Sequence, residues 1–369
     1  MQNLINQISR FFLGSLLIFS GLIKLNDPVG TQIKLEEYFE VFAIDFGSFF
    51  HFLIPYSLII GMLIIVLELT LGVAILIYFR MCLTTWVLLL LMVFFSFLTF
   101  YSAYFNKVTD CGCFGDAIQI SPWQSFGKDI VIMVFTLHLF YYRRKYNSVL
   151  SALNGHIVIV CTVLISTLIG VYVINHLPIF DFRAYKVGNN IPQQMQAPEK
   201  AKIEYVFEKD GQEIKSLKYL SVDEGYKYKS SRIMNENRIK PKISDYYVTS
   251  PDGEDITNTT FRGLQLLVII GEVGKSSTHN IGAIRKLIFD FKDTVNCLVL
   301  TSSNKQDIEA FITDNQLDAN YAFVDATVLK TIVRSNPGIT LWKDGTVLGK
   351  WHYRDTPTSE QIFSLVNKR

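Results

Sequence analysis

The sequence has little charge and few cysteines. Only 18% of its 369 residues are Asp, Glu, Lys or Arg, and the formal net charge is +2. This charge is too small to indicate a nucleic-acid partner, because phosphate backbones are bound by clustered cations. Of the five cysteines, two lie in a short polar loop between two long apolar runs, Asp110-Cys111-Gly112-Cys113-Phe114-Gly115-Asp116. If one segment carries chemistry, we expect it to be this loop.

A cleavage site for a signal peptide is also lacking. The first apolar run, residues 11–25, is followed by Asn26-Asp27-Pro28 and not by small residues. A cleaved signal peptide ends in a small-residue site. We therefore expect this run to remain as the first membrane span.

Apolar residues, in contrast, make up half of the sequence and are concentrated before residue 178. A helix that crosses the hydrocarbon core, about 30 Å thick, needs roughly 20 apolar residues, because no unpaired backbone group can face lipid. Five stretches meet this requirement: 8–25, 56–79, 82–105, 122–142 and 156–177. The fourth opens with Ser121, Pro122 and Gln124, the pattern of a capping box. We therefore predict that this part of the chain lies in a lipid bilayer.

The cations between these stretches predict the orientation. Arg80 lies between the second and third spans, and Arg143-Arg144-Lys145 follows the fourth. Short cytoplasmic loops are enriched in Lys and Arg. We expect a multi-pass protein of a bacterial inner membrane, with the N-terminus in the cytoplasm. The cysteine loop and everything after residue 177 would lie in the periplasm, where disulfides persist.

Among the charged residues within the predicted spans, we single out Lys24 and Glu68 as candidate site residues. Lys24 lies near the outer boundary of the first, where its long side chain can reach the headgroups. Glu68 lies about twelve residues into the second, roughly 18 Å deep at 1.5 Å per residue. A carboxylate at that depth must be protonated, paired or facing a polar cavity. His138 is a candidate partner, although a neutral histidine hydrogen-bonded inside the bundle is the alternative. Residues 31–42 are predicted to form a short interfacial helix.

The sequence turns polar after residue 177, and residues 188–200, with Pro192 and Pro198, have the composition of a linker. Hairpins are predicted around Asp210-Gly211 and Asp252-Gly253, because Asp-Gly suits the positive φ angles of tight turns. Beyond them, strands and helices alternate, with strands at 264–270, 297–300, 321–323, 339–343 and 347–351 and helices at 280–291, 305–315, 328–333 and 359–367. This order predicts a mixed α/β sheet with covered faces.

The stretch Asn336-Pro337-Gly338-Ile339-Thr340-Leu341-Trp342-Lys343-Asp344-Gly345 resembles the part of thioredoxin-like proteins in which a cis proline precedes a strand and a turn. Pro337 falls at that proline, and the resemblance covers residues 241–369. Catalytic thioredoxins carry Cys-x-x-Cys after the first core strand, where a helix N-terminus lowers the thiol pKa. This sequence has Gly271 to Ser277 there, without cysteine. Cys297 begins a predicted core strand and is expected to be a buried, inert thiol. We expect this domain to be redox-inactive on its own.

The apolar half resembles the DoxX and MauE group, the latter named for methylamine utilisation. The matching residues are Ser20-Gly-Leu-Ile-Lys24-Leu25 with Asp27-Pro28, Glu68-Leu-x-Leu-Gly72, and Cys111-Gly-Cys113-Phe114-Gly115. The resemblance implies a four-helix membrane bundle associated with thiol or quinone redox chemistry and with maturation of disulfide-containing envelope proteins. We therefore predict four parts: a membrane bundle at 1–150, a fifth transmembrane helix at 151–177, a linker with a β-hairpin at 178–240, and a periplasmic thioredoxin-like domain at 241–369.

Four interpretations of the loop remain open. Cysteines two apart can just form a disulfide, and such a strained bond is easily reduced, so Cys111 and Cys113 could exchange with a periplasmic client and pass electrons to a membrane quinone, with Glu68 moving protons. The pair could instead be a structural disulfide. A metal site would use Asp110 and Asp116, but no histidine lies nearby to complete a zinc set. Finally, the protein could be a non-catalytic scaffold whose thioredoxin-like domain holds an envelope client or assembly partner. Lys24, Phe114, Gly115 and Pro337 complete the candidate site residues.

Overall fold

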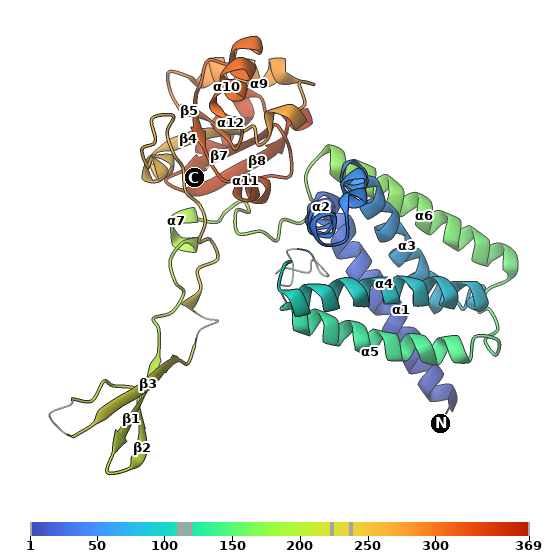
Figure 1. The fold of residues 1–369 in the computed structure, drawn as a ribbon. Helices are drawn as coiled ribbons and strands as arrows, with labels where there is room; N and C mark the ends of the chain where they lie inside the picture. Colours follow the sequence, from blue (N-terminus) through green and yellow to red (C-terminus); the bar gives the residue numbers. More distant parts are fainter. Residues whose placement is uncertain (1, 109–114, 116–119, 222–224, 236–238, 368–369) are drawn as a thin grey trace. The chain divides into compact units, whose positions relative to one another are not determined.

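A computed structural model describes residues 2–108, 115, 120–221, 225–235 and 239–367. The chain divides into two units, Met1–Arg183 and Ala184–Arg369. The first is helical and the second contains the strands (Figure 1). Each unit is described by itself below.

The first unit contains every predicted apolar helix. These are α1 (Gln2–Asn26), α3 (Ser57–Leu76), α4 (Met81–Phe105), α5 (Pro122–Tyr141) and α6 (Ala152–Asn175). Four helices in the described part are long and apolar enough to cross a membrane: α1, α3 with the preceding 3-10 helix η1 (Ser48–Tyr56), α4 and α6. The remaining predicted span, α5, is not among these four helices, and it carries the charged residues Lys128 and Asp129. The prediction of a helix at 122–142 is confirmed, whereas the prediction that this helix crosses the membrane stays a prediction.

Local signals explain where two helices begin. The capping box of α5 is present, since the Ser121 hydroxyl accepts a hydrogen bond from Gln124 N at 3.3 Å and Gln124 Oε1 accepts one from Ser121 N at 3.0 Å. Helix α2 (Pro28–Asp45) begins with Pro28 after Asp27, whose carboxylate accepts a hydrogen bond from Gly30 N at 2.9 Å. It is longer than the predicted helix at 31–42, and it buries Leu35, Tyr38, Phe39 and Phe42.

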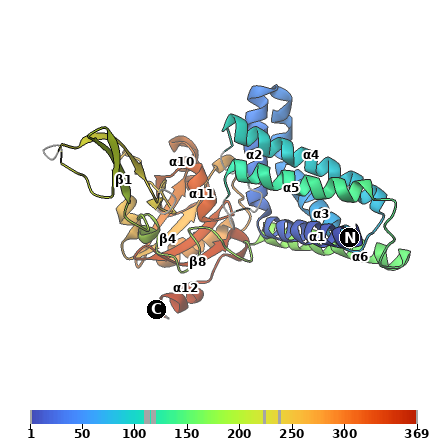
Figure 2. The ribbon, with the colours of Figure 1, turned by 90° about the horizontal axis from the view of Figure 1, so that it is seen from below.

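The long helices pack as one pair and one group of three. Helix α4 lies beside α5, and α3 packs against both α1 and α6 (Figures 1 and 2). The first pair and α1 share a core that includes Leu13, Leu88 and Leu139. Glycines let α1 and α3 approach: a methyl group on Gly72 would lie 3.0 Å from Gly14 O. This close approach brings the polar residues of the two helices within contact distance.

The second unit has a five-stranded mixed sheet of order β6-β5-β4-β7-β8. Strand β4 (Leu264–Ile269) pairs parallel with β5 (Asn296–Thr301) and antiparallel with β7 (Gly338–Lys343), while β6 (Asn320–Phe323) and β8 (Thr346–His352) form the edges. The helices are α9 (Ile281–Phe291), α10 (Lys305–Asp314), α11 (Ala326–Ile332) and α12 (Ser359–Asn367). The Asn336-Pro337 peptide is cis. The thioredoxin-like α/β prediction is therefore confirmed by the strand order and by this proline.

Two residues from the segment before the strands also belong to the core of the second unit. Tyr185 and Ile191 are buried, and Tyr185 stacks on Trp342 with ring centroids 6.4 Å apart. Helix α7 (Ile191–Gln194) begins where Ile191 N donates to Gly345 O at 2.8 Å. The sheet therefore recruits residues that lie about 150 positions earlier in the sequence.

The two predicted hairpins have different outcomes. The first is confirmed as β1 (Ile203–Lys209) and β2 (Gln212–Ser216), and it gains a third strand that we did not predict, β3 (Lys227–Ile233). The second is formed only in part and not as a pair of strands: an isolated bridge joins Thr249 and Asp255, and Ile256 N donates to Val248 O at 2.9 Å. Side chains add to these backbone contacts, since Val248 N donates to Thr257 Oγ1, and Thr257 N to Asp255 Oδ1, each at 2.9 Å.

Candidate functional site

A buried ion pair links α1 to α3. Lys24 Nζ lies 2.6 Å from Glu68 Oε2, and the two side chains are only 10% and 3% exposed. The Lys24 ammonium also lies 4.9 Å from the centroid of the Phe95 ring on α4. The prediction that Lys24 extends to the headgroups is therefore wrong, because the deeper carboxylate draws the ammonium into the bundle. Glu68 is paired, one of the three states expected for it.

His138 is not the partner of Glu68. Its Nε2 lies 2.9 Å from Asn6 Oδ1, near the first turns of α1. Asn6 and Lys24 are 18 positions apart in one helix, which corresponds to about 27 Å at 1.5 Å per residue. His138 therefore contacts the N-terminal end of α1, far from Lys24.

Our sequence reasoning missed a second buried carboxylate, Asp129 on α5. It is fully buried. Thr99 Oγ1 on α4 donates a hydrogen bond to Asp129 Oδ2 at 2.9 Å, and Lys128 Nζ lies 2.8 Å from Asp129 Oδ1. The signal that could have found it is the one that drew attention to Glu68, namely a carboxylate inside a predicted span.

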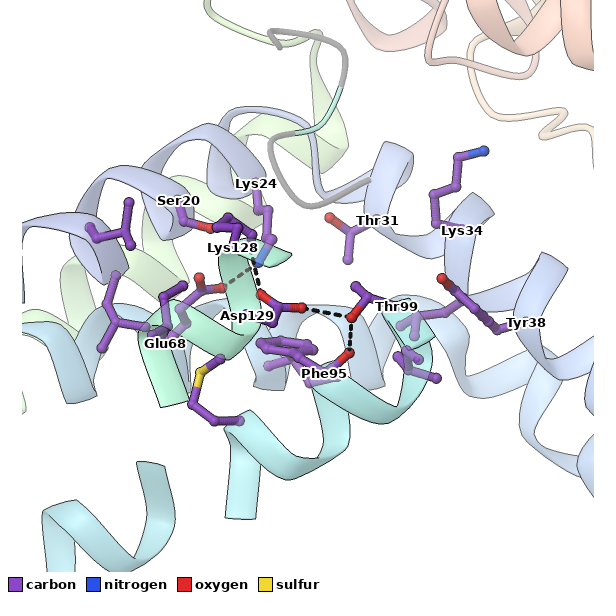
Figure 3. Close-up of a pocket in the computed structure, with 17 residues that line it drawn as sticks. Ser20, Lys24, Thr31, Lys34, Tyr38, Glu68, Phe95, Thr99, Lys128 and Asp129 are labelled. Carbon is purple, nitrogen blue, oxygen red and sulfur yellow. Dashed lines mark hydrogen bonds and ion pairs between the residues drawn. The ribbon is translucent and has the colours of Figure 1, made fainter. Parts of the chain in front are cut away.

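Both carboxylates line one cavity of about 80 Å³. Figure 3 shows the Lys24–Glu68 pair and the Asp129–Thr99 hydrogen bond on the walls of this cavity. The remaining polar lining comes from α1 and α2: Ser20, Thr31, Lys34 and Tyr38. Three lysines and two carboxylates therefore line a space of a few water molecules inside an apolar bundle.

The cysteine loop itself lies outside the described residues, and so do the predicted site residues Asp110, Cys111, Cys113, Phe114 and Asp116. Gly115 is described: it has φ +50°, and a methyl group on it would lie 3.7 Å from Ile23 Cγ2. Ile23 directly precedes Lys24 in α1. Gly115 therefore lies close to Ile23, on the helix that also carries Lys24.

The chain before the loop is anchored by polar contacts. The Ser102 hydroxyl donates to Val108 O, and Lys107 and the Tyr101 hydroxyl both contact the Asp45 carboxylate at the end of α2. Hydrogen bonds from Lys107 and then from Tyr101 lower the pKa of Asp45. Among the described residues, no group of three or more His, Cys, Asp and Glu side chains could hold a metal ion.

In the second unit, polar contacts fill the position of the thioredoxin cysteines. Asn336, which precedes Pro337, accepts hydrogen bonds from Gly271 N at 3.1 Å and Ser276 Oγ at 3.0 Å, and it donates to Glu272 O at 2.9 Å. Its side chain thus ties the segment from Gly271 to Ser276 to the cis proline.

Cys297 is buried in β5, as predicted. Burial raises the pKa of its thiol to about 11. The thiolate, which is the reactive form, is therefore scarce at neutral pH.

The fold and the site define a class: a multi-pass membrane bundle followed by a thioredoxin-like α/β unit without cysteines at its usual redox position. Residues 2–142 match the family described as Methylamine utilisation protein MauE. This match confirms the predicted resemblance of the helical half. No curated protein matches the sequence.

Solved structures resemble the α/β unit. They include a protein described as a thioredoxin from Neisseria meningitidis (14% identity, TM-score 0.28, 34% of this chain and 86% of that one). A thiol:disulfide interchange protein from Bacteroides sp. has 14% identity and TM-score 0.27, covering 33% of this chain and 84% of that one. StoA from Bacillus subtilis has 17% identity and TM-score 0.25, covering 32% and 94%. The fold assignment depends on the strand order and not on these values.

Proposed function

We propose that this protein is a thiol-disulfide exchange protein of the bacterial inner membrane, in which Cys111 and Cys113 exchange with cysteines of a periplasmic client. The observation that carries the proposal is the pair of cysteines two positions apart in the sequence, Cys111-Gly112-Cys113, shortly after the apolar helix α4. The same unit keeps the buried Lys24–Glu68 pair, and buried charges in a membrane bundle mark functional sites because they are costly to keep there.

The other cysteines are poorly suited to this chemistry. Cys297 is buried, with a raised thiol pKa. Cys82 and Cys161 lie on α4 and α6, and Cys82 is at the end of α4 opposite to the loop. Thiol exchange in the periplasm therefore falls to Cys111 and Cys113.

The proposed exchange needs no external oxidant. One thiolate of the pair attacks a client disulfide and forms a mixed disulfide, and the displaced client thiolate takes up a proton. The second cysteine then attacks the mixed disulfide and releases the reduced client. In this direction the pair ends as a disulfide, and a reductant must regenerate the dithiol. In the reverse direction the pair oxidises the client and ends as a dithiol, and the oxidant that would then accept its two electrons stays our prediction, a membrane quinone. The cavity of about 80 Å³ is too small to enclose a quinone, so we derive no step through one.

The second unit supports a client-binding role. Asn336 holds the segment after β4 in place with three hydrogen bonds, so this unit offers a shaped surface without a reactive thiol. A protein in which this unit only binds an envelope client, without any exchange in the loop, is the second candidate function.

Trapping a mixed disulfide tests the exchange. Cys113→Ser removes the resolving thiol, so Cys111 should accumulate a covalent adduct with a client that reductant releases. The matched control is Cys82→Ser, which removes an exposed thiol elsewhere in the same unit. Cells carrying each variant are quenched with acid, and adducts are separated without reductant.

The opposite outcome is equally clear. Both single serine variants of the pair could retain full activity in cells and form no adduct. The pair would then be a structural disulfide at most, and the binding function of the second unit would replace the exchange function.

A further inference from the structure

Positive charge is unbalanced at one end of the helical unit. Arg80 precedes α4, and Arg143-Arg144-Lys145 follows the end of α5. The sequence has no Asp or Glu at positions 69–109 or 130–180. Among the described residues, none of these four cations forms an ion pair with a carboxylate. This end of the bundle therefore attracts anions from its surroundings.

Arg143 is held at the junction of α4 and α5, which pack side by side (Figures 1 and 2). Its guanidinium carbon lies 3.9 Å from the ring centroid of Phe140 on α5 and 6.0 Å from that of Trp86 on α4. The two rings meet edge to face, with centroids 4.6 Å apart. Arg143 Nη1 donates to Phe140 O at 2.7 Å. A guanidinium has five N–H donors, so Arg143 has further donors to offer to the oxygens of an anion.

The surface of α4 next to these cations is apolar. Exposed apolar side chains recur there three and four positions apart, so they lie on one face of the helix. We call this face the α4 stripe; its members are Leu83, Trp86, Leu90 and Val93, each at least half exposed. In a membrane bundle such a face contacts hydrocarbon chains. The cations and the α4 stripe meet at Trp86, so together they form one amphipathic surface, charged at the helix end and apolar along the helix.

We propose that this surface is a binding site for an anionic phospholipid. The lipid phosphate contacts Arg143 and the neighbouring cations, and one acyl chain lies along the α4 stripe. Both halves of the ligand follow from the surface. Arginine binds phosphate through paired hydrogen bonds, and basic residues at the ends of membrane helices bind anionic headgroups. A soluble phosphate compound would leave the stripe unused. The inference goes beyond the proposed function and does not depend on thiol exchange.

The alternative role of these cations is to set the orientation of the chain in the membrane. Cations with that role alone need no particular lipid. A measured preference for one lipid at the α4 stripe therefore separates the two roles.

The fluorescence of Trp86 can report which lipid occupies the stripe, because bromine atoms on an acyl chain quench a nearby indole. The full-length protein is placed in nanodiscs of phosphatidylcholine with a minor share of phosphatidylglycerol, and either lipid carries the bromine. The Trp86 signal is the difference between the unchanged protein and Trp86→Phe, because the other tryptophans are common to both. We expect phosphatidylglycerol to be preferred at least about fivefold, the contribution of one cation near an anionic headgroup.

Single-charge variants test the residues. Arg144→Gln changes an exposed side chain outside the Arg143–Phe140 contact, and it should lower the preference about fivefold. Arg143→Gln should lower the preference at least as much, whereas Arg143→Lys keeps the charge and should retain part of it. Lys107→Gln is the matched control, because it removes one charge after the opposite end of α4, where Lys107 pairs with Asp45. It should leave the preference unchanged.

Three results would overturn the inference. Equal quenching of Trp86 by the two brominated lipids would mean that the cations only orient the chain. Loss of the preference on adding inorganic phosphate at constant ionic strength would make a soluble phosphate compound the ligand. A preference that survives both Arg143→Gln and Arg144→Gln would place the lipid elsewhere on the bundle. A failure of thiol exchange would alter none of these measurements, so the two proposals fail separately.

Discussion

Lys24 and Glu68 neutralise each other at 2.6 Å in a place with almost no exposed surface. Removing one partner of such a pair leaves an unpaired buried charge, which typically costs about 3 to 5 kcal/mol. The same argument applies to Asp129 with its two partners. At the scale of single residues, the buried carboxylates Glu68 and Asp129 therefore each face a lysine, and both line one cavity.

Cys297 allows a prediction on pH at this scale. Burial raises its thiol pKa from the ordinary 9.0 to about 11. The folded state therefore holds the proton more tightly than the unfolded state does, and this stabilisation is complete below pH 9 and is lost as the pH rises to about 11. Relative to Cys297→Ala, the unfolding free energy of a fragment of residues 184–369 should fall by about 2 kcal/mol across that window.

Urea unfolding of both fragments at several pH values measures this difference. Buried tyrosines such as Tyr185 and Tyr246 titrate in both fragments, so their contribution cancels. A difference between the fragments that does not change with pH would mean that the Cys297 thiol is accessible to water in the folded state.

At the scale of elements, the crossing of α1 and α3 decides whether the ion pair can form. A methyl group on Gly72 would lie 2.8 Å from Ile18 Cγ1 and 3.0 Å from Gly14 O, whereas one on Gly61 of the same helix would meet nothing closer than 3.4 Å. Backbone cannot yield as a side-chain end can. The glycine at 72 therefore permits the close approach that Lys24 and Glu68 need.

We expect Gly72→Ala to lower the free energy of unfolding of the membrane unit by about 1 to 3 kcal/mol, because α1 must shift away from α3. Gly61→Ala, the control in the same helix, should change stability by less than about 0.5 kcal/mol. Thermal unfolding of the full-length protein in detergent, followed by circular dichroism of the helices, tests both. Equal stability of the two variants would show that α1 and α3 adapt without cost.

At the scale of the whole molecule, the distribution of cations predicts which side of the membrane each loop faces. Arg80 and the Arg143-Arg144-Lys145 cluster lie at the same end of the bundle, opposite to the cysteine loop. Positive charge is retained on the cytoplasmic side. The loop and the α/β unit are therefore predicted to share the periplasm.

Thiol labelling of intact cells measures this orientation. A membrane-impermeant maleimide, added after reduction to variants with one cysteine each, should label Cys111 or Cys113 and leave Cys82 unlabelled. Cys82 is exposed in the structure, so its protection would come from the membrane and not from burial. Labelling of Cys82 alone would reverse the orientation of the chain.

The sequence by itself determined the features that depend on neighbouring residues. The apolar runs predicted the helices, the Ser121-Pro122 pattern predicted the start of α5, and the order of strands and helices around Pro337 predicted a thioredoxin-like unit. Local conformational preference and burial of one face act over a few residues, so a linear pattern records them.

Only the tertiary structure decided which charges meet. Lys24 pairs with Glu68, which lies 44 positions later in the sequence, and Thr99 bonds to Asp129, 30 positions later. Tyr185, which precedes all the strands in the sequence, stacks on Trp342. A lysine near a span boundary has equal local reason to extend toward the headgroups or to turn inward. The crossing of α1 and α3 chose between these, because it placed a buried carboxylate within reach of the ammonium.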